Sequence, residues 1–278
     1  MKHPFLSRDE LLDRIPIAHA KVPAIVDLHE ADYALTRLVR ENCLVLSETP
    51  TPLVIKGGFA VRHIHGGMRF SKDADVILAS PDLEIDGAEP GLLRMPPGME
   101  VTSEALTEAG KSWVISIHYV GTDRRGHSVT CDLNSRVRAL RLQPPRHEIF
   151  SSLFFDGEWR VWTASAEEIV AEKLAALLEE GADRIRDIFD VCTVLSTGPK
   201  RWDGTASRAL LDKILIAKQI APPDDLIGAV HQVSAAVGAE AAWQSQVIDV
   251  MPTRPRGLLP TVEELDDLLV DWGLAQSR

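Results

Sequence analysis

The sequence predicts an α+β fold, in which a small mixed or antiparallel sheet with flanking helices is followed by an α-helical C-terminal domain. Short runs rich in β-branched and aromatic residues, which are typical of strands, fall between Leu53 and Trp162. From Thr163 onward, apolar residues recur instead at the three- and four-residue spacing of helices. Because the strand pattern ends there, we expect a first domain of residues 1–162 and a helical domain of residues 163–278.

Two helices are expected before the first strand. A short helix at 7–15 has Ser7 as its N-cap and Glu10 three residues later, which is the spacing of a capping box. A longer helix is predicted from Pro23 to about Leu46, where apolar residues recur at helical spacing. The prolines that follow it lack the backbone N–H that a continuing helix needs.

Strands and two short helices make up the rest of the first domain. The predicted strands lie at or within 53–55, 68–78, 113–120, 127–133, 149–155 and 159–162. Short loops join the last four into two hairpins. Helices are expected at 59–65, directly after a pair of glycines, and at 102–109, within a stretch rich in proline and glycine.

The helical domain begins with a second capping box, formed by Ser165 and Glu168, and its first helix should end at Gly181. Asp183 is expected to cap the following helix. Three further helical stretches are predicted at 206–220, 224–237 and 262–274.

The charge of the chain limits how it could meet nucleic acid. A net charge of −11 argues against a protein that coats nucleic acid without specificity, because overall attraction to phosphate is missing. A basic band nevertheless lies between Gly121 and Arg146, and its arginines are Arg124, Arg125, Arg136, Arg138, Arg141 and Arg146. This band could receive an RNA or another phosphate-rich ligand, or it could be a solvated sheet edge.

Other features point to a cytoplasmic protein with ordinary thiols. The three cysteines are widely scattered and show no metal-ligand spacing. No apolar run reaches the ~18 residues of a membrane span, and the N-terminus lacks the apolar core of a secretion signal. We therefore expect no membrane partner. His63 and His65 lack an evident third ligand and are expected at the surface or in a loop.

The stretch from Ile55 to Leu78 carries the strongest chemical signal. It contains a Gly-Gly turn and then Asp73 and Asp75, separated by one residue in an apolar run. Residues two apart on a strand project from the same face, with Cα atoms roughly 6.5–7 Å apart. Two such carboxylates can hold Mg²⁺, which shares its coordination readily with substrate phosphates. This pattern indicates in-line displacement at phosphorus with metal assistance.

A third carboxylate, Asp132, lies within a later predicted strand. Burying it among apolar neighbours would be costly without a partner, and a metal site would supply one. Asp132 is therefore the candidate third metal ligand. The alternative is that it simply begins a turn at the end of the strand.

Four separated motifs occur in one characteristic order: K-G-G (56–58), R-F-S-K-D-A-D (69–75), A-E-K-L-A-A-L (171–177) and R-I-R-D-I-F-D (184–190). In this combination the chain resembles the AbiEii/AbiGii-type nucleotidyltransferase toxins of bacterial abortive-infection and toxin–antitoxin systems. Those toxins belong to the DNA polymerase β-like nucleotidyltransferase superfamily. The resemblance covers roughly residues 50–195 and implies a nucleotidyltransferase core in the first domain.

The resemblance also implies the roles of individual residues. Its nucleotide-binding positions are Lys56, Gly57, Gly58, Arg69, Ser71 and Arg186. Its metal ligands are Asp73, Asp75 and Asp132, for Mg²⁺ or Mn²⁺, and its catalytic positions are Asp73, Asp75, Lys173 and Asp187. Gly57 and Gly58 would cradle the phosphates, and Lys56 would contact them as a point charge.

The helical domain would add two clamps on the triphosphate, Lys173 and Arg186, and Asp187 would orient Lys173 or the incoming hydroxyl. Asp190, one turn from Asp187, is a further candidate. Without the resemblance, these residues would read as solvated side chains and surface ion pairs of little consequence.

The implied activity is transfer of a nucleoside monophosphate from an NTP to an acceptor, with the 3′ end of tRNA as the leading acceptor and a block of translation as the result. A toxin of this kind has a cognate antitoxin. Two alternatives remain open. The acceptor could be a hydroxyl of a protein or of a small molecule such as an aminoglycoside, or the chain could be a non-catalytic binding module of the same fold.

Overall fold

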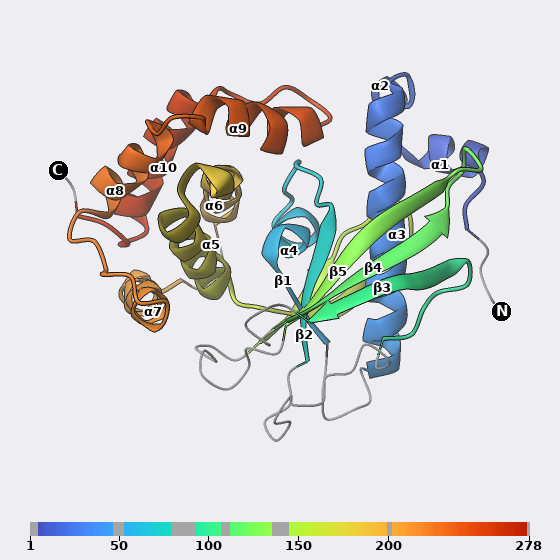
Figure 1. Ribbon diagram of the computed structural model, residues 1–278, viewed down its shortest axis with the longest axis horizontal. Helices are drawn as coiled ribbons and strands as arrows, with labels where there is room; N and C mark the ends of the chain where they lie inside the picture. Colours follow the sequence, from blue (N-terminus) through green and yellow to red (C-terminus); the bar gives the residue numbers. More distant parts are fainter. Residues whose placement is uncertain are drawn as a thin grey trace. The chain divides into compact units, whose positions relative to one another are not determined.

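The computed structural model describes residues 5–46, 53–78, 93–106, 112–134, 145–198 and 202–276. These residues form two compact units (Figure 1). The first, here called the sheet unit, takes the described parts of 1–64, 70–141 and 145–163. The second, here called the helical unit, takes 65–69 and the described residues from 164 onward.

A mixed sheet forms the centre of the sheet unit. Its strands among the described residues are β1 (Leu53–Lys56), β2 (Asp73–Leu78), β3 (Met99–Leu106), β4 (Ser112–Val120), β5 (Gly126–Asn134), β6 (Arg146–Phe150) and β7 (Trp159–Thr163). They follow the order β3-β4-β5-β2-β1-β7-β6 across the sheet. β2 is parallel to β5 and β1 to β7, whereas the other neighbours are antiparallel. The predicted α+β class is confirmed, and both predicted hairpins, β4–β5 and β6–β7, are present. The first strand of the second hairpin was predicted at 149–155, but it is β6 at Arg146–Phe150, and 151–155 are not in a strand.

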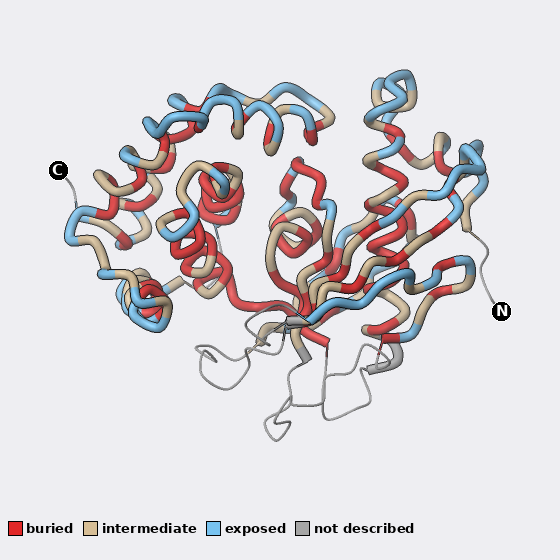
Figure 2. The backbone as a smooth tube through the Cα atoms, viewed as in Figure 1, coloured by how far each residue is buried: buried red, intermediate tan, exposed pale blue. Residues whose placement is uncertain are grey.

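The helices of the sheet unit are α1 (Arg8–Arg14), α2 (Ile17–Ala20), α3 (Pro23–Leu46) and α4 (Gly57–Ile64). The predicted capping box is present, since the Ser7 side chain accepts from the Glu10 backbone and the Glu10 carboxylate accepts from the Ser7 backbone. The long helix α3 packs against β1, β2 and β5, and its middle is largely buried (Figure 2). The short helix α4 packs against β1, β2 and β6.

The helical unit contains α5 (Ala166–Glu180), a 3₁₀ turn η2 (Gly181–Arg184), α6 (Arg186–Ser196), α7 (Gly204–Ala217), α8 (Leu226–Ser234), α9 (Ala239–Gln246), a 3₁₀ turn η3 (Ile248–Val250) and α10 (Leu258–Asp271). α5 packs against α6 and α7, and α10 packs against α6 and α8. Figure 2 shows α5 and α6 as mostly buried. Ser165 caps α5 by accepting from the Glu168 backbone, and Gly181 ends that helix in the left-handed region at φ 62°.

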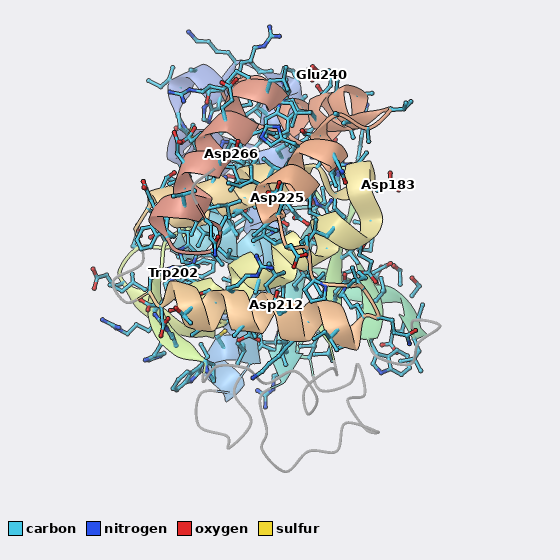
Figure 3. The ribbon with its side chains drawn as sticks, turned by 90° about the vertical axis from the view of Figure 1, so that its left-hand side faces the viewer. Asp183, Trp202, Asp212, Asp225, Glu240 and Asp266 are labelled. Carbon is cyan, nitrogen blue, oxygen red and sulfur yellow. The ribbon has the colours of Figure 1, made fainter. Side chains whose placement is uncertain are left out.

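Polar contacts fix the outer helices of the helical unit (Figure 3). The Asp225 side chain accepts from the Gly228 backbone at 2.8 Å and so caps α8. Asp266 on α10 pairs with the His231 ring of α8 at 2.7 Å. The Trp202 indole donates to the Trp272 carbonyl at 2.8 Å, which ties the start of α7 to the end of α10.

Other expectations from the sequence are wrong. The helix predicted at 102–109 is instead the strand β3 as far as Leu106, because pairing with β4 overrides the helical preference of Glu and Ala; 107–109 lie outside the described residues. Asp183 does not cap α6, since it lies in the η2 turn and α6 has no side-chain cap. His63 is buried rather than at the surface, with 4% of it exposed.

In the described part of the chain, no helix is long and apolar enough to cross a membrane.

Candidate active site

Three carboxylates lie on one face of the central sheet. β2 is parallel to β5, and the register places Asp75 directly opposite Asp132 and Asp73 opposite Thr130. Paired residues on neighbouring strands, and residues two apart on one strand, project from the same face. Asp73, Asp75 and Asp132 therefore share a face, as the sequence predicted for the first two.

Lys56 extends this row onto a third strand. It is the last residue of β1 and lies opposite Asp75 in the antiparallel pairing of β1 with β2. Lys56, Asp75 and Asp132 thus run side by side across three adjacent strands. Only 8% of Lys56 is exposed, so its charge acts in a partly desolvated setting.

Asp132 lies in an unfavourable electrostatic setting. Burial raises its pKa above the ordinary value, the negative charge of Asp73 raises it further, and Lys56 partly opposes both. Its Oδ1 atom is buried and accepts no hydrogen bond from the described residues. A buried carboxylate oxygen without a donor, beside a second carboxylate, is a position that a cation would stabilise.

The donor atoms of this face suit an open divalent-cation site rather than a closed one. In the part of the chain that the structure describes, no three His, Cys, Asp or Glu side chains are gathered closely enough to enclose a metal ion. Mg²⁺, however, usually keeps several waters and takes one or two carboxylates together with substrate phosphates rather than a closed protein cage. The all-oxygen donor set and the unpaired Oδ1 of Asp132 fit such an ion.

Gly57 lies against one of these carboxylates. It begins α4 directly after Lys56 with φ 64°, a left-handed conformation that favours glycine. A Cβ atom at this position would come within 1.8 Å of Asp75 Oδ2. The glycine is therefore required both by its backbone angle and by the close approach of Asp75. The first N–H groups of α4, at Gly57 and Gly58, have no partner within the helix and suit an anion.

Ser71 orients Asp73. Its hydroxyl donates to Asp73 Oδ1 at 2.8 Å, and only 4% of Ser71 is exposed. The sequence prediction gave Ser71 a nucleotide contact, whereas its described bond is to the carboxylate two residues later.

A second cluster of predicted residues lies within the helical unit. Lys173 on α5 donates to Asp187 Oδ1 at 2.9 Å and to Asp190 Oδ2 at 2.6 Å, both on α6. Arg69 holds Asp190 in a two-point bond of 3.0 and 2.7 Å, and Arg184 donates to Asp187 at 2.8 Å. Lys173, Arg69 and Arg184 thus converge on the two carboxylates of α6.

Burial and pairing compete in this cluster. Burial favours the neutral form of Lys173, but Asp187 and Asp190 outweigh it, so the pKa of Lys173 lies above its ordinary value. Burial likewise opposes ionisation of Asp190, but Arg69 and Lys173 outweigh it and hold the pKa of Asp190 below its ordinary range. The lysine and the carboxylate are therefore both charged at neutral pH.

The arrangement of this second cluster differs in part from the sequence prediction. Lys173 and Asp187 come together, as expected if Asp187 orients the lysine. Arg69, predicted to bind the nucleotide, bonds to Asp190. Arg186 is half-exposed and makes no hydrogen bond or ion pair with the described residues, whereas Arg184 joins the cluster. The three-residue spacing of Arg184, Asp187 and Asp190 was the signal that could have identified this set.

Comparisons with known proteins agree with this architecture. The family model described as "Nucleotidyl transferase AbiEii toxin, Type IV TA system" matches residues 37–269. MenT4, a nucleotidyltransferase toxin of Mycobacterium tuberculosis H37Rv, is similar in structure, with 22% identity, TM-score 0.61, and coverage of 95% of this chain and 88% of that chain. JHP933 from Helicobacter pylori is similar with 16% identity, TM-score 0.52, and coverage of 87% and 92%.

At these identities the two structures support the shared fold. No curated protein matches the chain significantly. The family model spans most of the sequence, including both clusters described above. The chain therefore belongs to the AbiEii family of nucleotidyltransferase toxins of type IV toxin–antitoxin systems.

Proposed function

We propose that this nucleotidyltransferase transfers a nucleoside monophosphate from an NTP to the 3′ end of tRNA and thereby blocks translation. The observation that carries the proposal is the shared face of Asp73, Asp75 and Asp132, with a buried oxygen of Asp132 that no described residue satisfies. An NTP presents its phosphates together with a hard cation, which is the ligand that such a face suits.

The three aspartates would hold Mg²⁺ or Mn²⁺. When bound there, the ion would offset charge on the α-phosphate and lower the pKa of the acceptor hydroxyl. Ser71 fixes the direction of Asp73 through its hydroxyl bond. Gly57 allows the start of α4 to lie against Asp75, so that helix N–H groups are available to phosphate oxygens.

The bond changes follow from the reaction class. The 3′-hydroxyl oxygen of the acceptor forms a bond to the α-phosphorus while the bond from that phosphorus to the bridging oxygen breaks, and pyrophosphate leaves. The hydroxyl proton passes to Asp132.

The helical unit contributes positive charge. Lys173 is positioned by Asp187 and Asp190. We assign Lys173 a role toward the triphosphate, with Arg186 as a second, half-exposed cation on the same helix as Asp187.

The surface charge supports an RNA acceptor on the sheet unit. Arg124 and Arg125 are exposed at the turn between β4 and β5, whereas Arg136, Arg138 and Arg141 lie outside the described residues. In the helical unit, acidic residues outnumber basic ones from 202 to 276, which would repel RNA phosphates. NTPs and tRNA meet in the cytoplasm, so we place the activity there, under the control of a cognate antitoxin as the family implies.

The acceptor is tested directly with the purified full chain, Mg²⁺ and each α-³²P-labelled NTP. Total tRNA, a protein extract and an aminoglycoside are offered in separate reactions. We expect label in tRNA with at least one NTP and none with the Asp73→Ala variant. Label in protein or antibiotic but not in RNA would support nucleotidyl transfer but contradict tRNA as the acceptor. Absence of label in every reaction would favour a non-catalytic binding module.

A further inference from the structure

A buried carboxylate outside the candidate active site holds one end of α4. Asp32 lies in the middle of α3 and is 2% exposed. Its Oδ1 atom accepts from Arg62 Nε at 3.0 Å and is 3.0 Å from His63 Nε2, and both partners belong to the last turn of α4. The opposite end of the same eight-residue helix is Gly57, against the Asp75 carboxylate.

The carboxylate at the centre of this network is ionised. Burial alone would raise the pKa of Asp32, but His63 and Arg62 outweigh it and hold the pKa at about 2. The other ring nitrogen of His63 lies 2.6 Å from the Ser151 carbonyl oxygen. His63 thus lies between the Asp32 carboxylate of α3 and the Ser151 carbonyl. Apolar replacements of buried ion pairs are often neutral or stabilising, so stability alone does not account for a charge at this position.

A second path leads from Asp32 to the aspartates. The Arg62 guanidinium lies over the ring of Phe70, 3.8 Å from its centroid. The same ring and the His29 ring of α3 form a T-shaped pair with a centroid separation of 4.8 Å, and Phe70 is 1% exposed. Phe70 directly precedes Ser71, whose hydroxyl holds Asp73. The ring is therefore an anchor for the segment that enters β2.

We propose that Asp32 is a positioning residue for nucleotidyl transfer. Asp32 fixes α4 through Arg62 and His63, and this holds Gly57 against Asp75. Asp32 also fixes Phe70 through the Arg62 guanidinium, and this sets the direction of the Asp73 side chain. The inference rests on the proposed function, in which Asp73 and Asp75 act on the NTP. Asp32 itself acts only through these neighbours.

The same helix offers a matched control. Glu30 is 1% exposed and lies two residues before Asp32 on α3. It accepts from the Thr122 backbone at 2.5 Å and from the Thr122 hydroxyl at 2.9 Å, at the turn between β4 and β5. Glu30→Gln therefore removes a buried charge of the same helix that serves the hairpin turn and not α4 or Phe70.

The experiment compares wild type, Asp32→Asn, Glu30→Gln and Asp73→Ala as full chains. Thermal melting gives the stability of each, and transfer of α-³²P-labelled nucleotide to total tRNA gives kcat and the KM for NTP. A small displacement of catalytic groups can cost roughly 100-fold in rate, so Asp32→Asn should lower kcat by roughly 10- to 100-fold with the KM for NTP changed by less than about threefold. Glu30→Gln should lower the melting temperature comparably and leave kcat within about threefold of wild type.

The outcomes separate the inference from the proposed function. If Asp73→Ala is inactive and Asp32→Asn has the kcat of Glu30→Gln, Asp32 is merely structural and the inference is overturned. If Asp73→Ala keeps wild-type activity, the proposed site itself is wrong. Should Asp32→Asn fail to fold, Phe70→Leu tests the same path, because it keeps an apolar side chain but removes the ring beneath Arg62; a wild-type kcat in that variant would also overturn the inference.

Discussion

Asp75 of β2 lies directly opposite Asp132 of β5, on neighbouring parallel strands that are far apart in the sequence. This pairing places a third carboxylate beside the Asp-x-Asp pair and gives the site its electrostatic character. Asp132 has a raised pKa and an unsatisfied buried oxygen, whereas Lys56 provides a nearby positive charge on the other side of Asp75. The row is poised to receive a cation and the phosphates that accompany it.

Asp132→Asn should abolish transfer while stabilising the protein without metal. The pKa of Asp132 is higher in the native state than in the unfolded state, so the native state binds more protons between these two pKa values. The free energy of unfolding of wild type therefore falls as pH rises through this range. The neutral amide of asparagine does not ionise, so the variant avoids this loss of stability. Activity should fall by at least roughly 100-fold. Mg²⁺ should raise the melting temperature of wild type more than that of the variant.

Melting with and without Mg²⁺ at pH 7, together with the transfer assay, checks this prediction. A variant that melts below wild type in the absence of metal would contradict the proposed repulsion between Asp132 and Asp73.

Gly57→Ala should damage both the fold and the activity. The new Cβ would lie 1.8 Å from Asp75 Oδ2, and the residue would have to keep φ 64°. We expect a loss of roughly 1–3 kcal/mol of stability and a large fall in kcat. Gly98→Ala is the matched control in the same unit, because Gly98 has φ 83° but no atom of the described residues lies within 4 Å of the place that its Cβ would take.

Urea unfolding and the transfer assay measure both variants. Gly98→Ala should lose some stability from backbone strain and keep its activity. Equal activity in the two variants would show that Asp75 can move away from α4 without consequence for transfer.

Asp190→Asn should weaken the helical unit at neutral pH. Its carboxylate is 1% exposed and bonds to both Arg69 and Lys173, and breaking such a buried pair costs roughly 3–5 kcal/mol. Because its native pKa lies below the unfolded value, the carboxylate stabilises the protein above the unfolded pKa, and this stabilisation is lost as pH falls toward the native pKa.

The variant should therefore differ from wild type most at pH 7 and least in strong acid. Urea unfolding across this pH range tests the dependence, with Asp212→Asn on the half-exposed Arg208 pair as the control. A constant difference at every pH would contradict the charge-based explanation.

Replacing the hairpin arginines should weaken tRNA binding and spare chemistry. Arg124 has φ 66°, so Arg124→Gly avoids added strain, and Arg125→Ala removes its exposed neighbour. Each lost phosphate contact should reduce the slope of log affinity against log salt by about 1. Titration of tRNA at several salt concentrations measures this slope. An unchanged slope in the double variant would show that the β4–β5 hairpin does not contact tRNA phosphates.

Local signals in the sequence were sufficient for much of the fold. The capping boxes at Ser7 and Ser165 and the apolar spacing after Pro23 predicted helices that are present. Alternation of β-branched residues predicted both hairpins, and the spacing of Asp73 and Asp75 predicted their common face. These features depend only on residues close together in the chain.

Features that depend on distant pairing were less accessible. An aspartate in an amphipathic helix reads as a solvent-facing residue, so nothing in the sequence identified Asp32 as buried or His63 as its partner. Arg69 precedes Ser71 by two residues, yet its partner is Asp190, more than one hundred residues away. The burial of such a side chain and the identity of its partner depend on tertiary packing, which one sequence does not reveal.

The central claim, transfer to the 3′ end of tRNA, is tested most directly by asking whether tRNA is labelled and where the label lies. Wild type and Asp73→Ala are incubated with total tRNA, Mg²⁺ and α-³²P-labelled NTP, and the labelled RNA is digested to map the added nucleotide. We predict label at the 3′ terminus with wild type and none with Asp73→Ala. Equal labelling by the two proteins, or label elsewhere than the 3′ end, would contradict transfer to the tRNA 3′ end at this site.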